Sequence, residues 1–207
     1  MTMGMDPVTA FVLAGGKSTR MGEDKAFLQL GDCTLLARAL DLARAATGNA
    51  WIVGCSGKFA AFGPVIEDIY PDCGPLGGIH AALTQTATDL NLMIAVDLPF
   101  LRPIFLNYLI NQARKTSAVV VVPKAAGGLQ PLCAVYRRGF AEVADRSLRA
   151  GKNKIDCLFA EVETRVIEQE ELKQNGFAEE MFRNLNTQED WEDARRRSSD
   201  LAPRTST

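Results

Sequence analysis

The sequence predicts an α/β protein built around a mainly parallel sheet. Short apolar runs of strand length alternate with stretches of helical periodicity, which is typical of strand–helix–strand units with right-handed crossovers. The run at residues 92–96 is continuously apolar, as expected for a strand that helices cover on both faces. With 207 residues, 47% of them hydrophobic, the chain is long enough for one domain with a sizeable core.

The first two thirds of the chain carry the clearest elements. Strands are expected at residues 8–13, 50–53, 65–69, 92–96 and 118–122. Three helices are expected between them: one capped by Asp32 or Thr34, one that begins near Pro75 or Leu76, and one that begins at Pro103. Asp and Thr suit a helix N-cap, and proline suits the first helical turn because it has no N–H to leave unpaired.

The last third of the chain is less regular. We expect strands at residues 131–136 and 162–167 and helices at 140–148 and 189–197, the last capped by Thr187. No linker or internal repeat divides the chain. The prediction is therefore a single domain over residues 1–197, followed by a polar, disordered tail at 198–207.

Composition narrows the functional classes. The formal net charge of -2 argues against nucleic acid or an anionic membrane as the main partner. No apolar run is long enough for a transmembrane helix, and the first ten residues lack the basic and apolar regions of a signal peptide, so we expect a cytoplasmic protein. The five cysteines form no CxxC pair, which argues against a zinc site and favours buried, reduced thiols.

The stretch "LAGGKSTRMGEDK", residues 13–25, follows the first predicted strand. Its glycines let backbone N–H groups approach a ligand closely, and the cations Lys17, Arg20 and Lys25 suit phosphate. It is not a P-loop, because Phe11 stands where the first glycine of that motif belongs, and it lacks the GxGxxG spacing. Ligands often bind after the first strand of an open α/β sheet, so we predict a phosphate loop of another type. The alternative is a glycine-rich turn with solvated cations.

Asp97 ends the predicted strand at residues 92–96. A carboxylate in this position can hold Mg²⁺, which bridges the oxygens of a triphosphate. The alternative is a turn or capping aspartate before a proline. Asp68 similarly ends a strand, and Gly74, Gly77 and Gly78 border a helix start where a ligand can approach the backbone. The alternative for this second segment is a purely structural loop.

Asn184 and Asn186 lie two residues apart on a segment expected to be extended. Their side chains would then face the same side, where two amides can hydrogen-bond a heterocycle. The alternative is that this segment only begins the last helix.

These motifs together resemble the signature of the molybdenum cofactor guanylyltransferase family. The resemblance rests on the first loop, "IEDIYPDCGPLGG" at residues 66–78, "DLP" at 97–99 and "NLNTQED" at 184–190. It implies a Rossmann-like three-layer α/β sandwich with a mainly parallel sheet, of the nucleotidyltransferase (GT-A-like) type. The chain departs from the family pattern where Gln188 replaces the usual proline and where "GKNK", residues 151–154, replaces a more arginine-rich stretch.

The resemblance also implies roles for single residues. Arg20, Lys25 and Asp97 would be catalytic, with Asp97 as the ligand of the cofactor Mg²⁺. Molybdopterin would contact Asn184 and Asn186. The nucleotide would contact Leu13, Ala14, Gly15, Gly16, Lys25, Asp68, Gly77, Gly78 and Asp97.

The implied reaction joins GMP from GTP to molybdopterin that carries molybdenum, and it releases pyrophosphate. Molybdenum cofactor biosynthesis proteins and molybdoenzyme chaperones are the protein partners that this reaction suggests. The nearest alternative is a cytidylyltransferase acting on the same cofactor or on a sugar or polyol phosphate. Its first motif more often reads LAAG, so the tandem glycines favour guanine. A third possibility is a nucleotide-binding accessory protein without activity, against which the intact Arg20, Lys25 and Asp97 argue.

Overall fold

A computed structural model describes residues 6–15, 24–185 and 187–200. Its main sheet has eight strands in the order β10-β7-β9-β6-β1-β4-β5, with β8 paired to β7. The strands are β1 (Val8–Leu13), β4 (Ala50–Val53), β5 (Val65–Ile66), β6 (Leu90–Ala95), β7 (Val120–Ala125), β8 (Gly128–Leu129), β9 (Cys133–Arg137) and β10 (Thr164–Ile167). A separate two-stranded hairpin joins β2 (Gln29–Leu30) to β3 (Cys33–Thr34).

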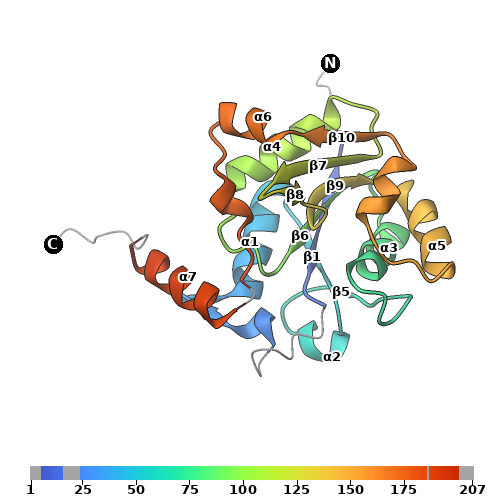
Figure 1. The fold of residues 1–207 in the computed structure, drawn as a ribbon. Helices are drawn as coiled ribbons and strands as arrows, with labels where there is room; N and C mark the ends of the chain where they lie inside the picture. Colours follow the sequence, from blue (N-terminus) through green and yellow to red (C-terminus); the bar gives the residue numbers. More distant parts are fainter. Residues whose placement is uncertain (1–5, 16–23, 186, 201–207) are drawn as a thin grey trace, which may run out of the picture.

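Helices cover both faces of the main sheet, which makes a three-layer sandwich (Figure 1). One face packs against α1 (Leu35–Thr47) and α4 (Pro103–Arg114), and the other packs against α3 (Pro75–Gln85) and α5 (Phe140–Arg149). The shorter helices are η1 (Lys25–Phe27), α2 (Ser56–Phe59), η2 (Asp156–Ala160), α6 (Gln169–Gln174) and η3 (Glu179–Phe182). The last helix, α7 (Gln188–Asp200), lies at the edge of the molecule away from α3 and α5 (Figure 1).

Strand β1 lies inside the sheet, between β4 and β6. It runs parallel to both of its neighbours, so that Leu13 lies opposite Val53 of β4 and opposite Ala95 of β6. All six residues of β1 are buried, and they alternate between the two cores: Val12 points to the α1 and α4 side, whereas Leu13 points to the α3 side. The parallel strands therefore end together at one edge of the sheet.

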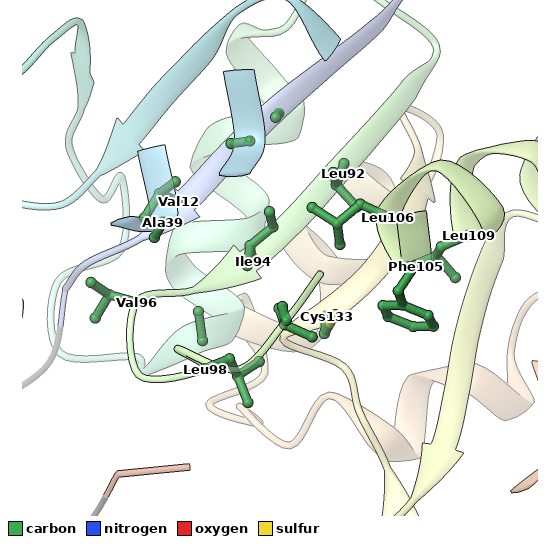
Figure 2. Close-up of a cluster of buried hydrophobic side chains, with 14 of the residues drawn as sticks. Val12, Ala39, Leu92, Ile94, Val96, Leu98, Phe105, Leu106, Leu109 and Cys133 are labelled. Carbon is green, nitrogen blue, oxygen red and sulfur yellow. The ribbon is translucent and has the colours of Figure 1, made fainter. Parts of the chain in front are cut away.

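The core on the α1 and α4 side reaches this edge (Figure 2). Val96 and Leu98, which directly follow β6, are 9% and 5% exposed and belong to the same buried cluster as Ile94 and Phe105. Asp97 lies between two buried apolar residues, so the backbone that carries its carboxylate is fixed by packing.

The predicted fold class is confirmed, and most predicted elements are present with ends shifted by a few residues. Thr34, not Asp32, caps α1 by accepting a hydrogen bond from the N–H of Ala37 (3.2 Å). Strand β5 stops at Ile66 instead of residue 69, because the chain turns away there into an irregular loop. The elements η1, α2, α6 and the β2–β3 hairpin were not predicted.

The sheet is mixed, because β9 runs antiparallel to both β6 and β7. The chain returns from β7 to β9 without a helix, through the short strand β8. A tight turn at Ala126 and Gly127, both with positive φ (51° and 77°), joins β7 to β8. Without a crossover helix, neighbouring strands can only pair antiparallel.

Helix α7 begins as predicted after Thr187. The Thr187 hydroxyl accepts a hydrogen bond from the N–H of Asp190 (3.1 Å), and the Asp190 carboxylate accepts one from the N–H of Thr187 (3.0 Å). This is a reciprocal capping box with Asp in the place of Glu. Trp191 and Ala194 bury the helix against the core. The helix continues to Asp200, beyond the predicted end at Arg197, and residues 201–207 lie outside the described part of the chain.

Within the described residues, no helix combines the length and apolar content needed to cross a membrane. All five cysteines are free thiols. The expectation that they are buried is wrong for Cys55 and Cys157, which are exposed, and it holds for Cys133. Cys55 follows the end of β4 and Cys157 lies on the short helix η2, and at both positions the side chain faces the solvent.

Candidate nucleotide-binding site

The ends of β1, β4 and β6 hold the start of the first loop in place. The N–H groups of Ala14 and Gly15 both donate to the carbonyl of Val53 (3.0 and 3.1 Å), and the N–H of Val96 donates to the carbonyl of Leu13 (3.2 Å). The side chains of Leu13 and Ala14 are buried in the cores, so these residues can meet a ligand only through their backbone. Gly15 is exposed.

Lys25 and Asp97 face each other at this edge of the sheet. Lys25 Nζ lies 3.7 Å from Asp97 Oδ2, and the two side chains are 17% and 23% exposed. Burial raises the pKa of Asp97, and the nearby Lys25 ammonium partly offsets this effect. The two residues come from η1 and from the turn after β6, so the fold joins two predicted catalytic residues that are far apart in sequence.

Asp24 caps η1, the short helix that carries Lys25, and the sequence analysis missed this role. Asp24 Oδ1 accepts a hydrogen bond from the N–H of Ala26 (3.2 Å) and caps η1, while its Oδ2 accepts one from Lys58 Nζ (2.9 Å). An aspartate just before a short helical run is itself a capping signal. The partner Lys58 gave no signal, because it lies on α2, which was not predicted.

Gly77 and Gly78 begin α3 beside the loop that carries Asp68. A Cβ at Gly77 would lie 2.9 Å from the carbonyl oxygen of Tyr70, and a Cβ at Gly78 would lie 3.0 Å from Val53 Cγ1. Either Cβ would also come within 4 Å of a carboxylate oxygen of Asp68. The missing side chains therefore make room for the protein's own loop and strand, a packing role that the sequence analysis did not separate from ligand approach. Partial burial raises the pKa of the Asp68 carboxyl, although the residue is exposed.

The segment with Asn184 lies next to Asp97. The N–H of Leu185 donates to the backbone carbonyl of Asp97 (3.1 Å), and Asn184 itself is exposed. Aromatic contacts hold the chain just before this segment against α4. The ring centroid of Phe105 on α4 lies 5.1 Å from that of Phe177 and 5.2 Å from that of Phe182, both edge-on. Two predicted sites that are far apart in the sequence thus meet at one edge.

Three predicted site residues, Gly16, Arg20 and Asn186, lie outside the described residues, and their roles stay predictions. A cavity of about 600 Å³ between α5 and η2 was not predicted as a site. It includes three cations from the region of the "GKNK" stretch, Arg146, Lys152 and Lys154, but no predicted site residue lines it.

The residues present fit a magnesium ion that is shared with a ligand. Among the described residues, no three His, Cys, Asp or Glu side chains gather into a metal-binding cluster. Mg²⁺ needs no such cluster, because it usually binds one or two carboxylates together with substrate phosphates and water. The Asp97 carboxylate, partly buried beside a lysine, meets this requirement.

A family model, the MobA-like NTP transferase domain, matches residues 10–166. The chain belongs to this family of MobA-like NTP transferases. A relative from Clostridium perfringens, named probable molybdenum cofactor guanylyltransferase, is 33% identical over 189 residues, which cover 89% of this chain and 94% of the relative. The molybdenum cofactor guanylyltransferase of Desulfosudis oleivorans is also 33% identical, over 92% of this chain and 95% of its own length.

Solved structures agree with this membership. The molybdopterin-guanine dinucleotide biosynthesis protein A of Archaeoglobus fulgidus superposes on this MobA-like transferase with a TM-score of 0.81 at 25% identity, over 93% of this chain and 99% of the other. The 4-diphosphocytidyl-2C-methyl-D-erythritol synthase of Anaerococcus prevotii reaches a TM-score of 0.70 at 15% identity, covering 94% and 96% of the two chains, and shares the fold. The resemblance seen in the sequence is therefore confirmed, and the protein is a nucleotidyltransferase.

Proposed function

We propose that this protein transfers GMP from GTP to molybdopterin carrying molybdenum, which yields the guanine dinucleotide form of the cofactor and pyrophosphate. The names of its relatives support the substrates, and the Lys25–Asp97 pair carries the proposal. A cation and a carboxylate 3.7 Å apart at the end of a parallel strand are suited to a triphosphate and its metal ion.

The reaction needs charge neutralisation more than a protein base. An oxygen of the pterin's terminal phosphate attacks the α-phosphorus of GTP, and the bond from this phosphorus to the bridging oxygen of the β-phosphate breaks. The nucleophile is already an anion, and pyrophosphate leaves with the bonding electrons. The protein must therefore hold two anionic groups in line and offset the negative charge that they bring together.

The residues at this edge of the sheet have separate parts in the proposed reaction. Lys25 binds phosphate oxygens of GTP, and the backbone of residues 13–15, fixed on β4, meets the base and sugar. Asp97 would hold the divalent cation, Mg²⁺ in our proposal, which neutralises phosphate charge when bound. Asn184 lies beside Asp97 and would hold the pterin with Asn186, so the acceptor approaches from the C-terminal segment.

The cellular setting is also a proposal. GTP and the molybdenum cofactor are the small-molecule partners, and molybdenum cofactor biosynthesis proteins and molybdoenzyme chaperones are candidate protein partners. We place the reaction in the cytoplasm, with no nucleic acid or membrane involved.

Direct transfer tests the proposal. Purified protein is mixed with molybdopterin carrying molybdenum, MgCl₂ and either GTP or CTP, and pyrophosphate release and the dinucleotide product are measured. We expect product with GTP and rejection of CTP by up to about 10⁴-fold, because a site that hydrogen-bonds one base leaves polar groups unpaired with another. Equal use of CTP would overturn the guanine assignment, and no product with either nucleotide would overturn the function.

A matched pair of variants tests the Lys25–Asp97 pair, the observation on which the proposal rests. Lys25→Ala should lower kcat/KM for GTP by at least about 10²-fold, the usual loss for one electrostatic contact to the reacting phosphates. Lys115→Ala is the control, because Lys115 is an exposed lysine directly after α4, just before β7 begins and thus at the opposite edge of the sheet. Equal activity in the two variants would remove Lys25 from the site.

A further inference from the structure

The loop between β5 and α3, residues 67–74, has an unusual backbone. It contains no helix or strand, and two of its residues, Asp72 and Gly74, have positive φ angles of 62° and 66°. Left-handed conformations are uncommon for residues other than glycine, and they persist where the surrounding contacts fix them. This loop carries Asp68, one of the predicted nucleotide contacts, so its position matters for the site.

The loop packs on the first turn of α3. The carbonyl oxygen of Tyr70 comes so close to Gly77 that a Cβ there would lie 2.9 Å away, and the Asp68 carboxylate lies over the same turn. The first turn of a helix carries its positive end. In α3, Pro75 has no N–H and the N–H of Gly77 donates to the carbonyl of Gly74 (3.1 Å), so a ligand meets this positive end and little free backbone N–H. The position of the loop therefore decides how a ligand can approach the start of α3.

Tyr70 connects this loop to helix α5. Its hydroxyl donates a hydrogen bond of 2.6 Å to Asp145 Oδ1, across 75 residues of sequence. Asp145 Oδ2 also pairs with Arg149 Nε at 2.8 Å, and the Tyr70 ring packs against the buried His80 of α3 with 5.2 Å between ring centroids. His80 Nε2 faces Asp145 Oδ1 at 3.7 Å. The loop, α3 and α5 thus meet at one carboxylate.

The hydroxyl of Tyr70 has no partner in the proposed chemistry, and its ring already packs like that of a phenylalanine. We propose that Tyr70 is a positioning residue, which sets the affinity for GTP by tying the 67–74 loop to Asp145 of α5. The inference rests on the proposed function, since GTP is the nucleotide concerned. The same hydrogen bond lowers the pKa of Asp145, so the carboxylate stays ionised and the bond stays charge-assisted at neutral pH.

The chain supplies a matched control on the opposite face of the sheet. The Tyr108 hydroxyl donates to Glu171 Oε1 at 2.8 Å, and Glu171 pairs with Arg165 at 2.6 Å. This second tyrosine–carboxylate–arginine group has the same chemistry and is also partly buried, but it joins α4 to α6, and neither of these helices carries a predicted nucleotide contact. A Tyr→Phe change at either position removes one hydroxyl and one charge-assisted hydrogen bond.

The experiment compares Tyr70→Phe with Tyr108→Phe. We expect both variants to melt at a lower temperature than the wild type, and only Tyr70→Phe to raise the KM for GTP, by about threefold to tenfold, with kcat within twofold. A threefold to tenfold rise in KM corresponds to part of the free energy that a hydrogen bond to a charged group contributes. The dissociation constant of GTP, measured by calorimetry without molybdopterin, should rise by the same factor.

Other results of this experiment would contradict the positioning role of Tyr70 or the proposed function. An unchanged KM in Tyr70→Phe, or an equal rise in both variants, would overturn the positioning role. If Tyr70→Phe does not fold, Asp145→Asn provides the second variant, because it keeps an acceptor but removes the charge, and a GTP affinity equal to that of the wild type would overturn the role as well. Failure of the proposed function would appear separately, as a wild-type protein that neither binds nor uses GTP.

Discussion

At the scale of the residue, Lys25 and Asp97 have opposite effects at neutral pH: Lys25 raises the free energy of unfolding, and the ionised Asp97 lowers it. Burial raises the pKa of Asp97, which means that the folded protein favours the protonated acid more than the unfolded chain does. For a carboxyl group with a raised pKa, the contribution to stability is complete below the unfolded pKa and is lost as the pH rises through the folded pKa. At neutral pH, the ionised Asp97 therefore lowers the free energy of unfolding. Residues that function requires often lower stability in this way.

The first prediction follows from this asymmetry. Asp97→Asn should keep or raise the melting temperature at pH 7 while it lowers turnover by at least about 10²-fold, because the amide cannot replace a carboxylate at a metal ion. Lys25→Ala should instead lower the melting temperature, since it leaves the partly buried carboxylate without its cation. Thermal unfolding and GMP transfer, measured on both variants, check the prediction. A destabilised but active Asp97→Asn protein would contradict it.

Sequence reasoning assigned roles to residues that stand in a local motif, and these roles stay predictions. Lys25 stands in the glycine-rich loop and Asp97 ends an apolar run, so each could be assigned before their 3.7 Å contact was known. Tyr70 had no such signal, because its partner Asp145 is 75 residues away and only the packing of α3 on α5 brings the two together. Contacts made by tertiary packing between distant segments are what a single sequence hides.

At the scale of the element, the start of α7 separates a binding residue from a capping residue. Thr187 and Asp190 satisfy each other's backbone N–H groups, whereas Asn184 is exposed and forms no part of that capping box. The two interpretations of this segment, pterin contact and helix start, can therefore apply to different residues only a few positions apart.

The second prediction uses this separation. Thr187→Ala should lower the free energy of unfolding by about 1 kcal/mol, the usual cost of a lost N-cap, with no specific change in the KM for molybdopterin. Asn184→Ala should leave stability within about 0.5 kcal/mol, as is usual for surface positions, and raise the KM for molybdopterin while the affinity for GTP is unchanged. Urea unfolding and steady-state kinetics on both variants decide. A normal pterin KM in Asn184→Ala would remove this residue from the acceptor site.

The third prediction concerns the start of α3. Gly77→Ala should lower the free energy of unfolding by about 1–3 kcal/mol, because the new Cβ would lie 2.9 Å from the carbonyl of Tyr70, where the backbone itself must move. Gly139→Ala is the control: no heavy atom lies within 4 Å of its Cβ position, and its φ of -60° suits alanine. We expect this control to be neutral or stabilising by up to about 1 kcal/mol. Equal unfolding midpoints for the two variants would show that α3 and the loop adjust freely.

At the scale of the whole molecule, the periodicities of apolar residues predicted the three layers better than they predicted the directions of the strands. Most strand and helix positions followed from apolar runs and capping residues, and the three-layer arrangement followed from their alternation. The antiparallel β9 was not predicted, although the absence of a helix between the strands at 118–122 and 131–136 was visible in the sequence. The order of strands across the sheet depends on which edges pair, and local patterns do not contain that information.

The last prediction concerns both faces of this sheet at high pH. Tyr108, on the α4 side, has a pKa raised to about 12, first by burial and then by its hydrogen bond to Glu171. Tyr136, buried on the α3 and α5 side, has a pKa raised well above its ordinary value by burial. An unfolded tyrosine ionises near pH 10, so above that pH the unfolded chain releases protons that the folded protein keeps. Stability should therefore fall as the pH rises from 10 towards 12.

Tyr108→Phe isolates one of these groups. Without the hydroxyl, the free energy of unfolding should fall less steeply above pH 10, with a slope that differs from the wild type by up to about 1.4 kcal/mol per pH unit, the limit for one proton. Below pH 9 the variant should be the less stable protein, because it lacks the hydrogen bond to Glu171, so the two stability curves converge as the pH rises. Urea unfolding at several pH values from 8 to 11.5 measures both slopes. Parallel curves over this range would mean that the Tyr108 hydroxyl ionises equally well in the folded and unfolded states, and that burial at this position does not protect its proton.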